Sequence, residues 1–238
     1  MAPRMASPIA RASRNSVVDL AAMSLREANQ LLHDTDGGDF LIRNPRGAHS
    51  LACGLDGDLN VVIDGHVGYY CAGMNQRATV RIHGNAGVGL AENMMSGLVV
   101  VDGNASQSAG ATAHGGLLVV KGDASARCGI SLKGGDIVVG GSIGHMSCFM
   151  AQAGRLVVLG DAGDALGDSL YEARIYVRGS VASLGSDCVE KELRDDHVAE
   201  LADLLERAGF DDLDPSQFRR YGSARALYTF KVDNVGAY

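Results

Sequence analysis

Histidine and cysteine side chains are the groups in this chain best suited to nucleophilic chemistry. His66 and His145 lie close to glycine-rich turns, and Cys71 and Cys148 lie on the same repeated region. A histidine beside a thiolate makes a nucleophilic pair, but the pair requires spatial contact and an electropositive setting that no sequence motif here indicates. We therefore predict no catalytic residue and leave the roles of these four residues open.

No other motif for catalysis, cofactor binding or metal binding is present. The chain lacks a Gly-x-x-x-x-Gly-Lys-Ser/Thr phosphate loop, a His-Glu-x-x-His helix and cysteines at metal-binding spacing. Residues 84–89, GNAGVG, have a nucleotide-binding appearance but lack the long helix that should follow. We interpret them as a structural corner, and predict no cofactor or metal site in this chain.

Three arginines near the C-terminus are candidates for binding a partner. Arg219, Arg220 and Arg225 lie close to Tyr221 and Tyr228. A guanidinium binds a carboxylate through two parallel hydrogen bonds, so these residues could clamp carboxylates of a partner. Arginines that are only exposed to solvent, and bind no partner, account for this pattern equally well.

A repeat must position all of these residues. Gly84 follows Gly65 by 19 residues (84 − 65), and the same interval leads on to Gly103, Gly122, Gly141, Gly160 and Gly179. Four and two residues before each glycine stand aliphatic residues, which the alternation of a strand places together on a buried face. We expect the glycine to turn a corner with a positive φ, and a second strand to follow it.

These features predict the fold. A lap of 19 residues with short strands is too short for a strand, a helix and their loops. The sequence therefore predicts an all-β, right-handed parallel β-helix of about seven laps over residues 59–186. It also predicts stacking contacts one lap apart, between His66 and Asn85 and between His83 and Asp102, as surface ladders rather than catalytic pairs.

One row of outward positions is unexpectedly apolar. Between the two core residues of successive laps stand Val100, Val119, Val138 and Val157. Each such side chain gains about 1.5–3 kcal/mol when it is covered. Either a helix predicted over residues 189–208 or a partner subunit covers these valines, and the sequence favours neither.

The flanking segments complete the predicted domain plan. We expect a disordered tail at 1–16 and a cap at 17–58, with a helix at 24–33 that begins at a capping box, a strand at 40–42 and a turn at 44–47. Residues 187–238 are expected to hold the helix at 189–208, a short helical turn opened by residues 214–216, and a terminal strand at 226–232.

Composition limits the class of partner and the compartment. The net charge of −7 argues against nucleic acid, and no run approaches the roughly 20 apolar residues of a membrane span. Five cysteines without a paired spacing indicate buried thiols in a reducing, cytoplasmic setting.

Several segments resemble a known family. Residues 84–97 (GNAGVGLAENMMSG), 126–131 (ARCGIS) and 144–150 (GHMSCFM) are similar to the glycine-rich β-helix domain at the C-terminal end of the glutamate synthase large subunit. The resemblance covers residues 17–238, and residues 218–228 (FRRYGSARALY) strengthen the likeness to the free-standing subunit of N-methylglutamate synthase. One subunit of formylmethanofuran dehydrogenase, and of the related formyltransferase/hydrolase complex, is a more distant likeness.

The resemblance implies a non-catalytic structural subunit in a hetero-oligomeric complex. Its partners would be a glutamine amidotransferase-like subunit and a flavin-binding, glutamate-synthase-like subunit, which would carry the FMN and an iron–sulfur cluster. The assembly would convert glutamate and methylamine to N-methylglutamate and ammonium. The alternative is a subunit of a one-carbon complex of the formylmethanofuran dehydrogenase or formyltransferase/hydrolase type.

Overall fold

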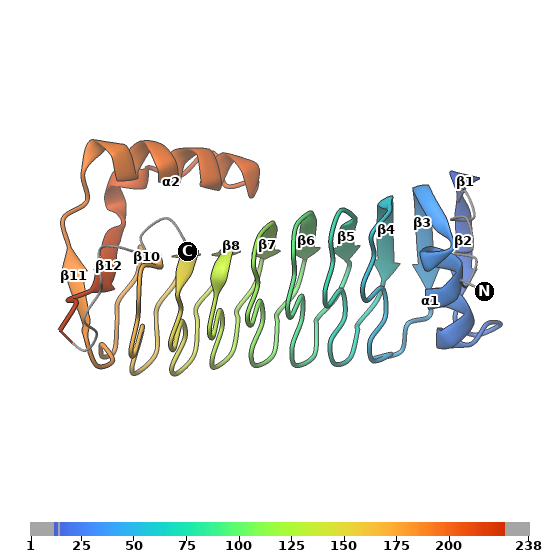
Figure 1. Cartoon of the computed structure of the whole chain (residues 1–238), viewed down its shortest axis with the longest axis horizontal. Helices are drawn as coiled ribbons and strands as arrows, with labels where there is room; N and C mark the ends of the chain where they lie inside the picture. Colours follow the sequence, from blue (N-terminus) through green and yellow to red (C-terminus); the bar gives the residue numbers. More distant parts are fainter. Residues whose placement is uncertain (1–11, 14, 227–238) are drawn as a thin grey trace, which may run out of the picture.

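The structure is a computed structural model that describes residues 12–13 and 15–226. It is a parallel β-solenoid of about seven laps, each of about 19 residues, so the predicted fold class is confirmed. Figure 1 shows the laps stacked in one column, with strands β4 to β10 side by side. These strands are β4 (Asp58–Asp64), β5 (Thr79–Ile82), β6 (Leu98–Val101), β7 (Leu117–Val120), β8 (Lys133–Val139), β9 (Ala153–Val158) and β10 (Arg174–Val177).

The paired aliphatic residues form the core, as predicted. Each pairs in parallel with its equivalent one lap later, for example Val61 with Val80 and Val80 with Val99. All fourteen are at most 1% exposed: Val61, Ile63, Val80, Ile82, Val99, Val101, Leu118, Val120, Ile137, Val139, Leu156, Val158, Ile175 and Val177. Branched side chains stacked at one spacing fill the column and fix its register.

The repeated glycines have a different role from the one expected. Only Gly65 has a positive φ, whereas Gly84 and the five glycines that follow it in the repeat do not. A Cβ on any of these six would lie 2.3–2.9 Å from a backbone atom of the equivalent glycine one lap earlier. They are glycines because the backbones of neighbouring laps touch there.

The segment that follows the glycine corner of each lap also differs from the prediction. After each corner a single bridge replaces the expected strand, in the series Val67, Ala86, Ala105, Ala124, Ile143, Ala162 and Val181. In the segment after this bridge, alternate residues have left-handed backbones. Examples are Tyr70, Ala72 and Met74, whose φ values are 57°, 53° and 55°.

The N-terminal flank forms the first rows of the sheet. Helix α1 (Leu25–His33) begins at the predicted Ser24 capping box, and β3 (Thr35–Arg43) contains the predicted strand. The expectation of disorder across 1–16 is wrong for the part described, because β1 (Ala12–Ser13) and β2 (Ser16–Asp19) pair in parallel with β3. Asn29 of α1 ties the helix to the first lap through the backbone of Ser50 and Ala52.

The C-terminal flank closes the other end with antiparallel strands. The helix predicted from residue 189 begins later, as α2 (Asp195–Arg207), because β11 (Cys188–Lys191) precedes it. The predicted helical turn is η1 (Pro215–Gln217), and β12 (Arg219–Ser223) then pairs antiparallel with both β10 and β11. The strand expected at 226–232 lies outside the described residues, apart from Ala226, which is not in a strand.

Candidate partner-binding surfaces

One row of outward-facing side chains crosses the sheet from β2 to β10. The pairing of the strands aligns Val17, Leu41, Val62, Arg81, Val100, Val119, Val138, Val157 and Tyr176, which we call the outer row. Arg81, paired with Asp102 at 2.7 Å, divides it into two apolar stretches. Each stretch is a hydrophobic surface that needs cover.

Helix α2 covers the stretch beyond Arg81. It lies along the stacking direction, above the C-terminal strands (Figure 1). Its buried residues Leu201, Leu204 and Leu205 form one apolar cluster with the outer row and with Phe218. The four candidate valines are at most 9% exposed, so the chain's own helix, not a partner, covers Val100, Val119, Val138 and Val157.

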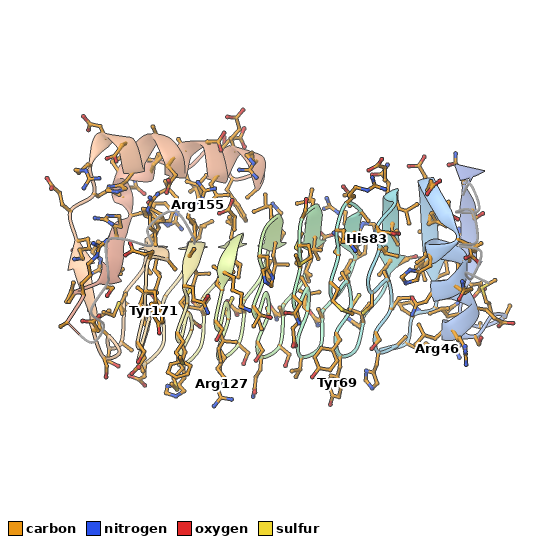
Figure 2. All side chains as sticks on the ribbon, viewed as in Figure 1. Arg46, Tyr69, His83, Arg127, Arg155 and Tyr171 are labelled. Atoms are coloured by element: carbon orange, nitrogen blue, oxygen red, sulfur yellow. The ribbon has the colours of Figure 1, made fainter. Side chains whose placement is uncertain are left out.

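Charged groups fasten α2 near its middle and at its C-terminal end. Glu200 accepts a hydrogen bond from the hydroxyl of Tyr176 at 2.9 Å and pairs with Arg174. At the C-terminal end of α2, the ammonium of Lys121 donates to the carbonyl of Ala208 at 2.6 Å, where the helix leaves a carbonyl without an intrahelical partner. Figure 2 shows Arg155 in the space between α2 and the strands.

A polar cleft of about 370 Å³ opens beside this network. It is lined by the charged side chains of Asp136, Arg155, Glu172, Arg174 and Glu200. Arg155 donates two hydrogen bonds of 2.6 Å to the carboxylate of Asp136. Four of these side chains, Asp136, Arg155, Arg174 and Glu200, pair with one another, and Glu172 pairs with Arg225. We therefore interpret the cleft as the fastening of α2 rather than as a ligand site.

Acid should loosen α2 through Glu200. Burial raises the pKa of this carboxyl, but hydrogen bonds from Arg174 and Tyr176 and the nearby guanidinium charges outweigh it and hold the pKa below the usual 4.5. A carboxyl with a depressed folded pKa stabilises the fold above its unfolded pKa, and this contribution is lost as the pH falls through the folded value. We expect the thermal midpoint to fall from pH 7 to below pH 4.5 by less in Glu200→Gln than in the wild type. Equal pH dependence would contradict this role.

The three candidate arginines are all engaged within the chain. Arg219 donates to the carbonyl of Gly179 at 2.8 Å, and Arg220 donates to the carbonyl of Glu192 at 2.9 Å. Arg225 pairs with Glu172 at 2.9 Å. These contacts fasten β12 and the following residues to the end of the solenoid, and both partners of the exposed Arg225 pair remain accessible.

The histidines and the thiols differ in their exposure to solvent. His66 and His145 are exposed, whereas Cys71 and Cys148 are fully buried. The ring of His66 instead accepts the backbone N–H of Asn85, as the predicted stacking requires, and His83 lies 3.7 Å from Asp102. The same polar ladder continues at 2.7–3.0 Å through Asn85, Asn104, Asp123, Ser142, Asp161 and Ser180.

Burial makes the cysteines poor nucleophiles. It raises the pKa of the Cys71 and Cys148 thiols, and raises the pKa of Cys128 to about 12. All five cysteines are free, and Cys53 alone is half-buried rather than buried. We expect a thiol reagent at about pH 8 to modify at most Cys53 within minutes in the native protein, and all five thiols after unfolding. Rapid labelling of two or more native thiols would contradict this.

The stretch of the outer row before Arg81 is not covered by a described helix. Val17 is 61% exposed, and Leu41 and Val62 are half-buried. They line an apolar groove of about 610 Å³ together with Phe40, bordered by Asn60 and Asp39. The sequence showed this row only in part, since the pairing of β2 and β3 was not predicted.

Sequence reasoning also missed an aromatic and methionine surface on another side of the laps. Tyr69, Tyr70, Met74 and Met95 are exposed on two neighbouring laps. The signal was present, because the next two laps carry smaller or more polar residues at the repeat positions of Tyr70 and Met74, such as Ser108 and Asn93. It is easily overlooked because the aliphatic pairs of the strands give a much stronger periodic pattern.

The described residues hold no cluster of three or more histidine, cysteine, aspartate or glutamate side chains suited to a metal ion. Within the same residues, neither helix has the length and apolar character needed to cross a bilayer. Fold and surfaces together define a parallel β-solenoid with two helices, one of which covers part of the outer row.

The chain belongs to the GlxC family. It is 61% identical over 226 residues to Protein GlxC of Rhizobium meliloti strain 1021, an alignment that spans 93% of this chain and 99% of that protein. The parallel β-solenoid is consistent with the fold expected from the resemblance to the glutamate synthase domain. No family model matches the chain. No solved structure matches it either.

Proposed function

We propose that this chain is a structural subunit of a glutamate-synthase-like complex. The observation that carries the proposal is a column of stacked laps whose described part has one continuous core. Each lap is fixed to the next by parallel strands and by the polar ladder. A stacked column of this kind holds bound subunits at a set separation better than a flexible linker does.

The particular complex that we propose is N-methylglutamate synthase. Support comes from the resemblance of residues 84–97, 126–131, 144–150 and 218–228 to its free-standing β-helix subunit. In this assignment an amidotransferase-like subunit and a flavin-binding subunit are the partners, with FMN and the iron–sulfur cluster on them. The five free cysteines are compatible with a reducing cytoplasm, where we place the complex.

An activity assay tests the proposal. The purified chain alone should convert no methylamine and glutamate, whereas the amidotransferase-like and flavin-binding subunits should gain or increase N-methylglutamate formation when the chain is added. Turnover by the chain alone would refute the structural role. Stimulation of formyl transfer in place of N-methylglutamate formation would favour the one-carbon complex.

A further inference from the structure

An apolar surface lies on the side of the solenoid away from α2. Of the eight large hydrophobic side chains that are exposed among the described residues, four lie on two neighbouring laps. They are Tyr69 (51% exposed), Tyr70 (47%), Met74 (53%) and Met95 (47%), which we call the Tyr-Met patch. Figure 2 shows Tyr69 directed outward at the lower edge of the column, with α2 above the opposite edge.

The patch borders one carboxylate, that of Glu92. A Cβ on Gly89 would lie 2.6 Å from the Tyr70 ring and 2.9 Å from a carboxylate oxygen of Glu92. The N–H of Met74 donates to the carbonyl of Glu92 at 2.8 Å, and the N–H of Met95 donates to the carbonyl of Asn75, the residue after Met74. The Tyr70 ring and the Glu92 carboxylate therefore meet above Gly89, and the backbones of Met74 and Met95 lie in the adjoining segments of the two laps.

The fold does not require these side chains. Tyr70 and Met74 have left-handed backbones, with φ values of 57° and 55°, which disfavour bulky residues. The next laps place Gly89 and Ser108 at the position of Tyr70, and Asn93 and Thr112 at that of Met74. The apolar residues occupy positions at which smaller or more polar ones build the same lap.

Contacts within the chain hold the two tyrosine rings of the patch. The ring of Tyr69 stacks on His49, with centroids 4.4 Å apart and planes inclined by 10°. The ring of Tyr70 lies over Gly89, where no side chain could fit beneath it. Tyrosine and methionine are enriched at protein interfaces, and a side chain that is already held loses little entropy on binding.

We propose that the Tyr-Met patch docks another subunit of the complex, through apolar side chains surrounding a lysine or arginine that pairs with Glu92. This inference rests on the proposed function. Among the described residues Glu92 is in no ion pair. A second copy of this chain fits less well, because a two-fold interface centred on the patch brings two Glu92 carboxylates together.

Substitutions taken from other laps test the proposal without disturbing the fold. The variant Tyr70→Ser, Met74→Asn, Met95→Gln installs residues that the chain itself uses at Ser108, Asn93 and Gln76. Met150→Ser is the matched control, because Met150 is 38% exposed and occupies the position of Met74 four laps later, next to the lap of Ser131. Binding of each purified partner subunit is measured by calorimetry, and folding by thermal unfolding.

We expect the triple variant to bind one partner subunit at least about 100-fold more weakly, with an unchanged unfolding midpoint and unchanged binding by the control. Glu92→Gln should weaken binding and reduce its dependence on salt. Equal binding by the triple variant and the wild type would overturn the docking site alone. If neither partner subunit binds the wild type, the proposed function fails with it, and a wild-type dimer that the triple variant abolishes would assign the patch to a second copy.

Discussion

Replacing Gly84 by alanine is expected to destabilise the solenoid by about 3 kcal/mol. The new Cβ would lie 2.7 Å from the carbonyl carbon of Gly65, 2.8 Å from its oxygen and 2.9 Å from the nitrogen of His66. All three are backbone atoms, so relief requires β4 and β5 to separate. For a protein of this length the thermal midpoint should fall by roughly 10 °C, as measured by circular dichroism.

Gly222→Ala is the matched control for this prediction. Gly222 lies in β12, where the nearest atom to an added Cβ is a side-chain carbon of Lys191 at 3.6 Å, an ordinary contact. Its midpoint should stay within about 2 °C of the wild type. A Gly84→Ala midpoint that also stays in this range would show that the laps are not in contact at the glycines.

Replacing Leu201 by alanine should release α2 from the sheet. Leu201 is fully buried in the cluster that includes Val138 and Val157, and such a truncation costs about 2–5 kcal/mol. Because α2 packs on one face of the column, the effect should remain local. Hydrogen exchange of the α2 amides should accelerate about 100-fold, while the amides of β4, β5 and β6 keep wild-type rates.

Glu206→Ala controls for the change in helix sequence, since Glu206 is exposed on the same helix. It should leave the exchange of α2 nearly unchanged. Acceleration across all the strands in Leu201→Ala would mean that α2 and the solenoid unfold as one unit, which contradicts a separately docked helix.

The sequence was sufficient to predict the column because its information is local and repeated. The residues around Val61 and Ile63 recur in every lap, so each lap independently indicated the same strand and the same buried face. The capping box at Ser24 and the cap at Asp214 were also local signals, and the structure has both.

The C-terminal closure was harder to predict because it depends on distant pairing. Ile175 pairs with Tyr221 across 46 positions (221 − 175), and residues 219–223 show no alternation of apolar and polar residues. The charged residues of β11 likewise contributed to a predicted helix that begins too early, at residue 189. The sequence left open whether the chain's own helix or a partner covers the outer valines. The position of α2 decides this, and that position depends on packing.

The proposed role of this column, to hold other subunits together, is tested most directly by native mass spectrometry after co-expression with the amidotransferase-like and flavin-binding subunits. We expect one assembly that contains all three chains and that does not form when this chain is omitted. An assembly of the other two subunits that forms equally well without it, or a chain that is found only alone or with copies of itself, would contradict this role.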